Sequence, residues 1–130
     1  MTPDAPSGDT YGDEVDPSWI CKDIHVKVGQ NNEAPERVGQ EGYVISSDPV
    51  SNRVNVSING EVVTLGPGSL RPVMPLTGQR VKIVSGDNAG IMGTLISVEE
   101  VNADGVVQTD DDEIRLLPVR HLCKLAEHLQ

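Results

Sequence analysis

Hydrophobic and polar residues alternate along two short stretches of the chain. Residues 24–28 read Ile-His-Val-Lys-Val, and residues 54–58 read Val-Asn-Val-Ser-Ile. A period of two is typical of a strand with one buried face. The second stretch runs into Asn59-Gly60, a strong hairpin signal because both residue types accept a positive φ, so residues 61–65 are the expected return strand. Between residues 19 and 118 no stretch has a convincing helical period.

The second half of the chain repeats the first. Residues 39–46 align with residues 90–97 at an offset of 51, and Ser69-Leu70 aligns with His121-Leu122 at an offset of 52. An offset that changes only within loops indicates a duplicated unit. Each unit then holds about five short strands in roughly 50 residues, the size of an SH3-like barrel.

We therefore predict an all-β protein with two tandem SH3-like small β-barrels, over residues 19–73 and 74–130. Residues 1–18 carry five acidic residues, no basic residue and three prolines. With almost nothing apolar to bury, they predict a disordered, acidic and Pro-rich tail. The join at residues 72–78 contains Pro72 and Pro75 and is short, so the barrels are expected to sit against each other rather than on a free tether.

Charge changes the expected partners. The chain has 20 acidic and 10 basic residues and a formal net charge of −10. An acidic surface repels phosphate backbones, because nucleic-acid affinity depends largely on Lys and Arg displacing counterions. The composition therefore argues against a strong RNA-binding surface.

The sequence contains no recognisable targeting signal or membrane span, and its cysteines do not indicate a disulfide. No apolar run approaches the ~18 residues needed to span a bilayer, and the first residues lack a basic start and an apolar stretch. We expect an intracellular, monomeric chain without membrane contact. Cys21 and Cys123 are expected to be free thiols.

A motif emerges in the second unit. Residues 81–98 place Gly86 and Gly90 in a loop between two strands, and Gly93 at the start of the second strand. A glycine within a strand permits a bulge or a close backbone approach, which lets a small sheet curl. Gly42 is the equivalent position in the first unit. The pattern resembles a KOW motif, with Gly42, Gly86, Gly90 and Gly93 as its structural glycines.

KOW modules occur in ribosomal proteins, in NusG and in its eukaryotic relative, the large subunit of the DSIF transcription elongation factor. The chain resembles the C-terminal end of that subunit from about Trp19 to Leu125. The resemblance is strongest in five short segments, residues 23–28, 38–42, 70–73, 81–83 and 122–125.

The resemblance implies a non-enzymatic, nuclear docking module that associates with RNA polymerase II and helps control pausing and processivity. It implies no cofactor. The implied partners are the RNA polymerase II elongation complex and, through the rest of the factor, its small zinc-binding subunit.

RNA binding is the alternative, because many KOW domains bind RNA. If the alternating core residues face inward, a mild basic stripe faces outward, and the nascent transcript would contact it mainly on the first barrel. These candidate residues are His25, Lys27, Arg53, Asn55, Arg80 and Lys82. The plainer interpretation is that they are solubilising positions on strand faces. The second barrel has Asp87-Asn88-Ala89 where an RNA-binding loop is expected to be basic.

Other chemistry has weaker support. The spacing of Cys21, His25, His121 and Cys123 lacks the tight knuckles of structural zinc sites. The glycines of residues 86–93 lack the Lys-Ser/Thr of a phosphate loop. The acidic run at 110–113 falls at a hairpin tip, where a solvated charge run is the commoner explanation. Without an aromatic residue, the second unit cannot form a methyl-lysine cage.

Overall fold

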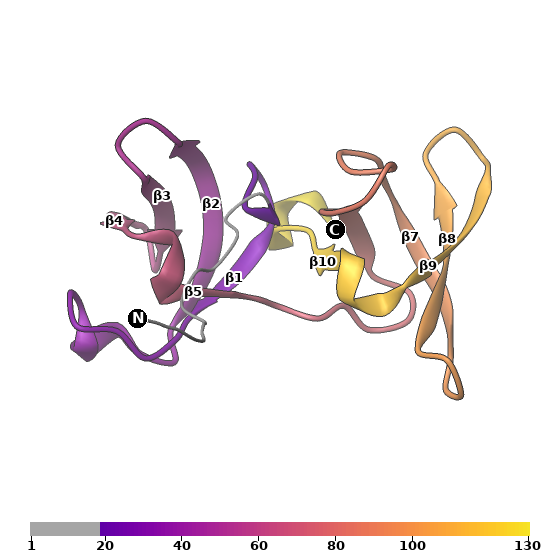
Figure 1. The fold of residues 1–130 in the computed structure, drawn as a ribbon, viewed down its shortest axis with the longest axis horizontal. Coiled ribbons are helices and arrows are strands. Elements are labelled where there is room, and N and C mark those ends of the chain that lie inside the picture. Colours follow the sequence, from indigo (N-terminus) through magenta and orange to yellow (C-terminus); the bar gives the residue numbers. More distant parts are fainter. Residues whose placement is uncertain (1–18) are drawn as a thin grey trace, which may run out of the picture.

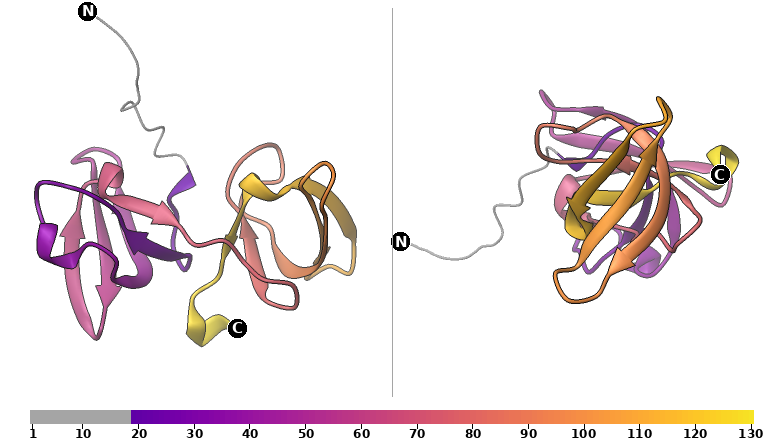
Figure 2. Two further views of the ribbon diagram at one scale, coloured as in Figure 1. Left: turned by 90° about the horizontal axis from the view of Figure 1, so that it is seen from below. Right: turned by 90° about the vertical axis from the view of Figure 1, so that its right-hand side faces the viewer.

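The computed structural model describes residues 19–130 and is all-β in this range, as predicted (Figure 1). Two five-stranded antiparallel sheets follow one another along the chain and lie side by side in Figures 1 and 2. The predicted disordered tail, residues 1–18, falls outside the described residues. No helix within 19–130 is long and apolar enough to cross a membrane.

The two sheets have the same strand lengths and the same order, which confirms the duplication. The first has the order β4-β3-β2-β1-β5 and is built from β1 (His25–Val28), β2 (Glu41–Asp48), β3 (Arg53–Ile58), β4 (Glu61–Leu65) and β5 (Leu70–Pro72). The second has the order β10-β6-β7-β8-β9 and is built from β6 (Arg80–Ile83), β7 (Met92–Glu99), β8 (Asp104–Thr109), β9 (Ile114–Pro118) and β10 (Leu122–Lys124). Short 3₁₀ turns add η2 (Pro35–Arg37), η3 (Pro67–Ser69), η4 (Val119–His121) and η5 (Glu127–Leu129).

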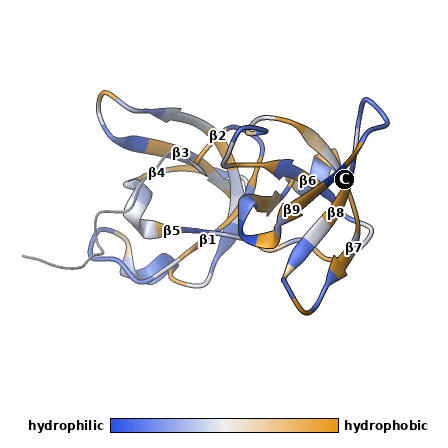
Figure 3. Ribbon diagram, turned by 45° about the vertical axis from the view of Figure 1, so that its right-hand side comes forward, coloured by the Kyte–Doolittle hydropathy of each residue, from blue (hydrophilic) through white to orange (hydrophobic). Residues whose placement is uncertain are grey.

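The alternating patterns form the predicted strands. In β3, Val54, Val56 and Ile58 are buried while the residues between them are more exposed. The β3–β4 hairpin turns at Asn59 (φ 52°) and Gly60 (φ 85°), which explains why this dipeptide stands there. Hydrophobic residues lie mainly along the strands (Figure 3).

Each sheet bends at a bulge in its long strand. The register of β2 against β3 shifts between Val44 and Ser46, and β7 shifts against β8 between Leu95 and Ser97. The sheets curl in this way, but the order of the strands leaves β4 and β5, or β9 and β10, unpaired with each other. Each unit is therefore an SH3-like barrel with an open seam.

Two apolar cores lie within the described residues, and one of them crosses between the units. The core of the second unit is formed by Val81, Ile83, Leu95, Val107, Leu117 and Leu122. The core of the first unit includes Val84 and Cys123, which belong to the second. The two units therefore share buried surface rather than only a linker.

Candidate functional site

The joint between the units is a short hydrogen-bonded bridge. The N–H of Val73 donates to the carbonyl of His25 in β1 (3.2 Å), and the carbonyl of Val73 accepts from the N–H of Lys124 in β10 (2.9 Å). One residue of the join thus pairs with a strand on each side. This confirms the expectation that the join is not a free tether.

The C-terminal segment crosses from the second unit onto the first. Leu125 forms a bridge with Ile24, and the N–H of Ala126 donates to the carbonyl of Asp23 (2.8 Å). Both Leu125 and Ala126 are completely buried. In Figure 1 and in the left view of Figure 2 the C-terminus lies near the junction of the two units.

Both cysteines are free, as predicted, and both lie near this joint. Cys123 is completely buried, and burial raises the pKa of its thiol to about 12. Burial also raises the pKa of the half-buried Cys21, opposed by the nearby Lys82 ammonium. Lys82 itself donates from Nζ to the carbonyl of Lys22 (3.1 Å), which places another contact across the joint.

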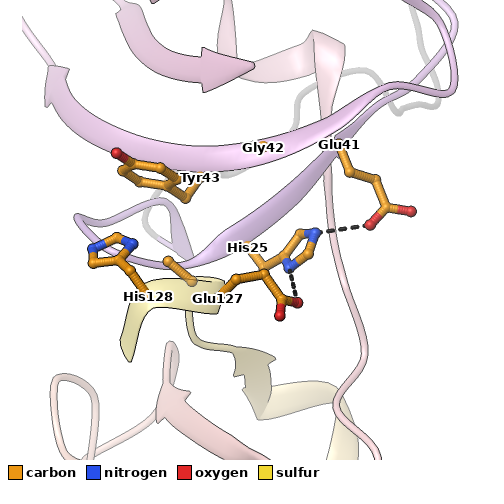
Figure 4. A pocket seen from close by; sticks show the side chains of 7 residues that line it. His25, Glu41, Gly42, Tyr43, Glu127 and His128 are labelled. Carbon is orange, nitrogen blue, oxygen red and sulfur yellow. Dashed lines mark hydrogen bonds and ion pairs between the residues drawn. The ribbon is translucent and has the colours of Figure 1, made fainter. Parts of the chain in front are cut away.

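A pocket opens where β1 and β2 meet the C-terminal segment (Figure 4). It has a volume of about 470 Å³ and is lined by His25, Glu41, Gly42, Tyr43, Ala126, Glu127 and His128. Tyr43 and His128 form its aromatic side, with ring centroids 4.7 Å apart and planes tilted by 59°. Two carboxylates and an aromatic pair suit a cationic group better than a phosphate.

His25 corrects the sequence-based expectation that this side chain faces solvent. It is only 8% exposed, because the C-terminal segment covers the face of β1 that would otherwise be outer. Its Nε2 lies 2.7 Å from Glu41 Oε1 and its Nδ1 lies 3.7 Å from Glu127 Oε2. Glu127 also binds Lys124, whose hydrogen bond lowers the pKa of that carboxyl.

Two of the other candidate surface residues are already paired with carboxylates. Arg53 is paired with Glu33 (2.8 Å), and Arg80 is held by both oxygens of Asp110 (3.0 and 2.8 Å). Lys27 is exposed, while Lys82 is turned towards the joint. Whether these positions contact a partner stays a prediction.

The KOW glycines occupy two kinds of position. Gly86 and Gly90 have φ values of 84° and 99°, which other residues rarely adopt. A side chain on Gly42 would collide with the Ser57 carbonyl, and one on Gly93 would collide with the Gln108 carbonyl. Close backbone approach, rather than unusual dihedrals, is what the latter two positions require.

The candidate zinc residues do not assemble into a site. Across residues 19–130, no group of three or more His, Cys, Asp or Glu side chains is placed to hold a metal ion. His121 lies instead beside the Gly86 loop, where a Cβ on Gly86 would lie 3.4 Å from its Nδ1.

One exposed surface has no counterpart in the sequence-based predictions. On the outer face of β8 and β9, Val106 stands directly opposite Leu116, and Ile114 lies opposite Gln108. Ile114 and Leu116 are 60% and 65% exposed. A position-by-position reading of the repeat would have found it, because Val106 and Leu116 align with the polar Asn55 and Thr64.

Comparison with known proteins gives consistent matches. The family model of transcription elongation factor SPT5, seventh KOW domain, matches residues 73–125. Transcription elongation factor SPT5 of Drosophila melanogaster is 33% identical over 110 residues, which cover 82% of this chain and 10% of that protein. The putative transcription elongation factor SPT5 homolog 1 of Arabidopsis thaliana is 27% identical over 113 residues, covering 85% of this chain and 10% of that protein.

The chain spans about a tenth of the length of these curated relatives. The boundaries expected at residues 18/19 and 73/74 stay predictions. The matched segment contains all five strands of the second sheet. The chain therefore carries a KOW domain of the SPT5 family, the large subunit of the DSIF transcription elongation factor.

Proposed function

We propose that the two units act as a protein-docking module, which holds the elongation factor against the RNA polymerase II elongation complex in the nucleus. Through this contact the module helps control pausing and processivity, without catalysis of its own. The names of the relatives support the setting, since both are transcription elongation factors. The small zinc-binding subunit is expected to bind the factor elsewhere, through the rest of its chain.

The observation that carries the proposal is the state of the basic side chains. All ten lie within the described residues, and five of them hold a carboxylate. The pairs are Arg37–Glu61, Arg53–Glu33, Arg80–Asp110, Arg115–Glu113 and Lys124–Glu127. A base already paired with a carboxylate is poorly placed to displace counterions from a phosphate backbone. Acidic side chains outnumber the basic side chains by two to one. The charge distribution therefore favours a protein partner over RNA.

The joint between the units also supports docking. Because Val73 is hydrogen-bonded to both sheets and the C-terminal segment is buried against Ile24, the outer surfaces of the two units keep a fixed relation. A preformed surface loses less conformational entropy on binding than a flexible pair of domains.

RNA contact through the first unit remains the second candidate, because one local feature favours it. Lys27 in β1 stands directly opposite Arg71 in β5, and both residues are exposed. These two neighbouring basic side chains could contact one stretch of the RNA phosphate backbone. Glu41, which faces Lys27 from the other neighbouring strand, weakens that site.

Titration with single-stranded RNA of several sequences, over a range of salt, separates the two functions. We expect binding no tighter than the ~10⁻⁴–10⁻⁶ M of non-specific contacts at physiological salt. Residual binding should fall with Lys27→Glu and change little with Arg120→Glu, an equal charge change at an exposed residue of the second unit. Sub-micromolar, sequence-selective binding that survives moderate salt would make RNA the principal ligand.

A further inference from the structure

The duplication provides an internal reference for the outer face of each sheet. In the first unit, Asn55 lies opposite Thr64 and close to Ser46. Asn55 Nδ2 donates to Ser46 Oγ (3.0 Å), and Thr64 Oγ1 donates to Asn55 Oδ1 (2.7 Å). Three neighbouring strands thus carry a hydrogen-bonded polar row across their outer face.

The second unit replaces most of this row with apolar side chains. Ser97, Val106 and Leu116 occupy the equivalent positions, in the same register. Because the first unit builds the same sheet with polar residues there, the fold does not require Val106 and Leu116 to be apolar. Leu116 is exposed and Val106 is partly exposed. Apolar side chains that reach solvent without being needed by the fold indicate a contact surface.

Acidic residues stand at both ends of this apolar surface, defined here as Val106, Ile114 and Leu116. The hairpin 110–113 adjoins Ile114 at one end. At the other end, Glu99 in β7 lies opposite Asp104 in β8 in the strand register. Among the described residues, Asp110 and Glu113 have arginine partners, whereas Asp111, Asp112, Glu99, Glu100 and Asp104 form no ion pair. Uncompensated negative charge therefore brackets the apolar side chains.

We propose that this apolar surface is where the module docks, and that its occupant is an extended protein segment with apolar residues between flanking lysines or arginines. The inference deepens the docking function proposed above and rests on it. The flanking lysines or arginines would lie against the acidic residues of the surface. This charge complementarity would steer and orient the encounter. β9 is an edge strand, paired with β8 alone among the strands of its sheet, so an extended segment can lie along it.

The same charges disfavour other occupants. A second copy of the chain would bring its own acidic ends against these, and like charges juxtaposed at an interface are strongly unfavourable. A phosphate backbone meets the same repulsion.

The test uses the intact factor bound to an elongating polymerase. A photoreactive amino acid replaces Ile114 in the second unit or, as the matched control, Val62, the aligned residue of the first unit, which is 67% exposed. After irradiation, the crosslinked peptides are identified by mass spectrometry. We expect position 114 to crosslink to a segment with apolar residues flanked by Lys or Arg, and position 62 to crosslink far less.

The polar row of the first unit supplies the disrupting variant. The double substitution Val106→Asn with Leu116→Thr places the aligned residues of the first unit on the second, so the sheet should remain folded, which a thermal melt of the chain checks. We expect it to reduce crosslinking from position 114 about tenfold, the loss that removing two apolar contacts gives. Added salt should reduce crosslinking further.

The outcomes distinguish failure of the proposed docking surface from failure of the proposed docking function. Crosslinks from position 114 to RNA or to an acidic segment would overturn the proposal, as would crosslinks that the folded double variant leaves unchanged. If position 114 gives none while other positions in residues 19–130 still crosslink to protein, this surface is wrong and the docking function stands. If no position crosslinks to protein, both are wrong.

Discussion

The thiol of Cys123 donates a hydrogen bond to the backbone carbonyl of His25, with 3.2 Å between Sγ and O, although the residues are 98 positions apart. The same carbonyl accepts the N–H of Val73. The last strand, the join and the first strand therefore meet at one oxygen atom. A rotation of one unit against the other would break the hydrogen bond between Cys123 and His25 and expose buried apolar surface.

Thiol alkylation should report on this joint. Cys123 is completely buried and its thiol has a pKa of about 12, so very little of the reactive thiolate is present at pH 8. We expect alkylation of Cys123 to be much slower than that of the half-buried Cys21, and to accelerate only in denaturant. Mass spectrometry over a time course distinguishes the two sites. Equal rates in the native protein would mean that the joint opens freely.

The two units should tumble as one body in solution. Backbone NMR relaxation is expected to give a single correlation time for residues 25–72 and 80–124, because shared buried surface joins them. Leu125→Ala should weaken the joint by about 2–4 kcal/mol, since it removes a fully buried side chain at the bridge with Ile24. Two clearly different correlation times in the unsubstituted chain would contradict the rigid pair.

Gly93→Ala should destabilise the second unit although it adds only one methyl group. The new Cβ would collide with the Gln108 carbonyl and approach the backbone of Thr109, which costs about 1–3 kcal/mol of unfolding free energy. Gly68→Ala is the matched control, because a Cβ there meets nothing within 4 Å. Denaturant melts compare the two. Equal stabilities would show that Gly93 is only a spacer.

Acid should weaken the first unit through Glu33. Burial raises the pKa of this carboxyl, but hydrogen bonds from Ser69, Gly66 and Arg53 outweigh it, and the pKa lies below its usual value. A depressed pKa stabilises the fold above the unfolded value of about 4.3, and this contribution is lost as pH falls through the folded pKa.

Glu33→Gln should therefore lower stability at pH 7 by about 1 kcal/mol or less, because the partly exposed pair is screened by solvent. It should also flatten the loss of stability between about pH 5 and pH 2. Glu36→Gln, an exposed neighbour, serves as the control. If melts show that Glu33→Gln loses stability with falling pH as the unsubstituted chain does, Glu33 does not contribute to the acid sensitivity.

Much of the fold follows from local patterns. The alternation in residues 54–58 and the Asn59-Gly60 turn predicted strands and a hairpin, because these features depend on near neighbours. The repeat offset predicted the two units. The burial of His25 could not be predicted from local patterns. It arises because the C-terminal segment, about 100 residues further along the chain, folds over β1. The ion pairs of Arg53 and Arg80 likewise depend on which loops meet in space. The apolar surface was visible in the alignment but only acquires meaning from the strand register.

The most direct test of protein docking is a crosslinking map of the intact factor on an elongating polymerase, made before and after RNase digestion of the emerging transcript. We expect residues 19–130 to crosslink mainly to protein, and we expect these crosslinks to persist after digestion. Crosslinks mainly to the transcript, with protein contacts that disappear when it is digested, would contradict protein docking and identify the module as an RNA-binding one.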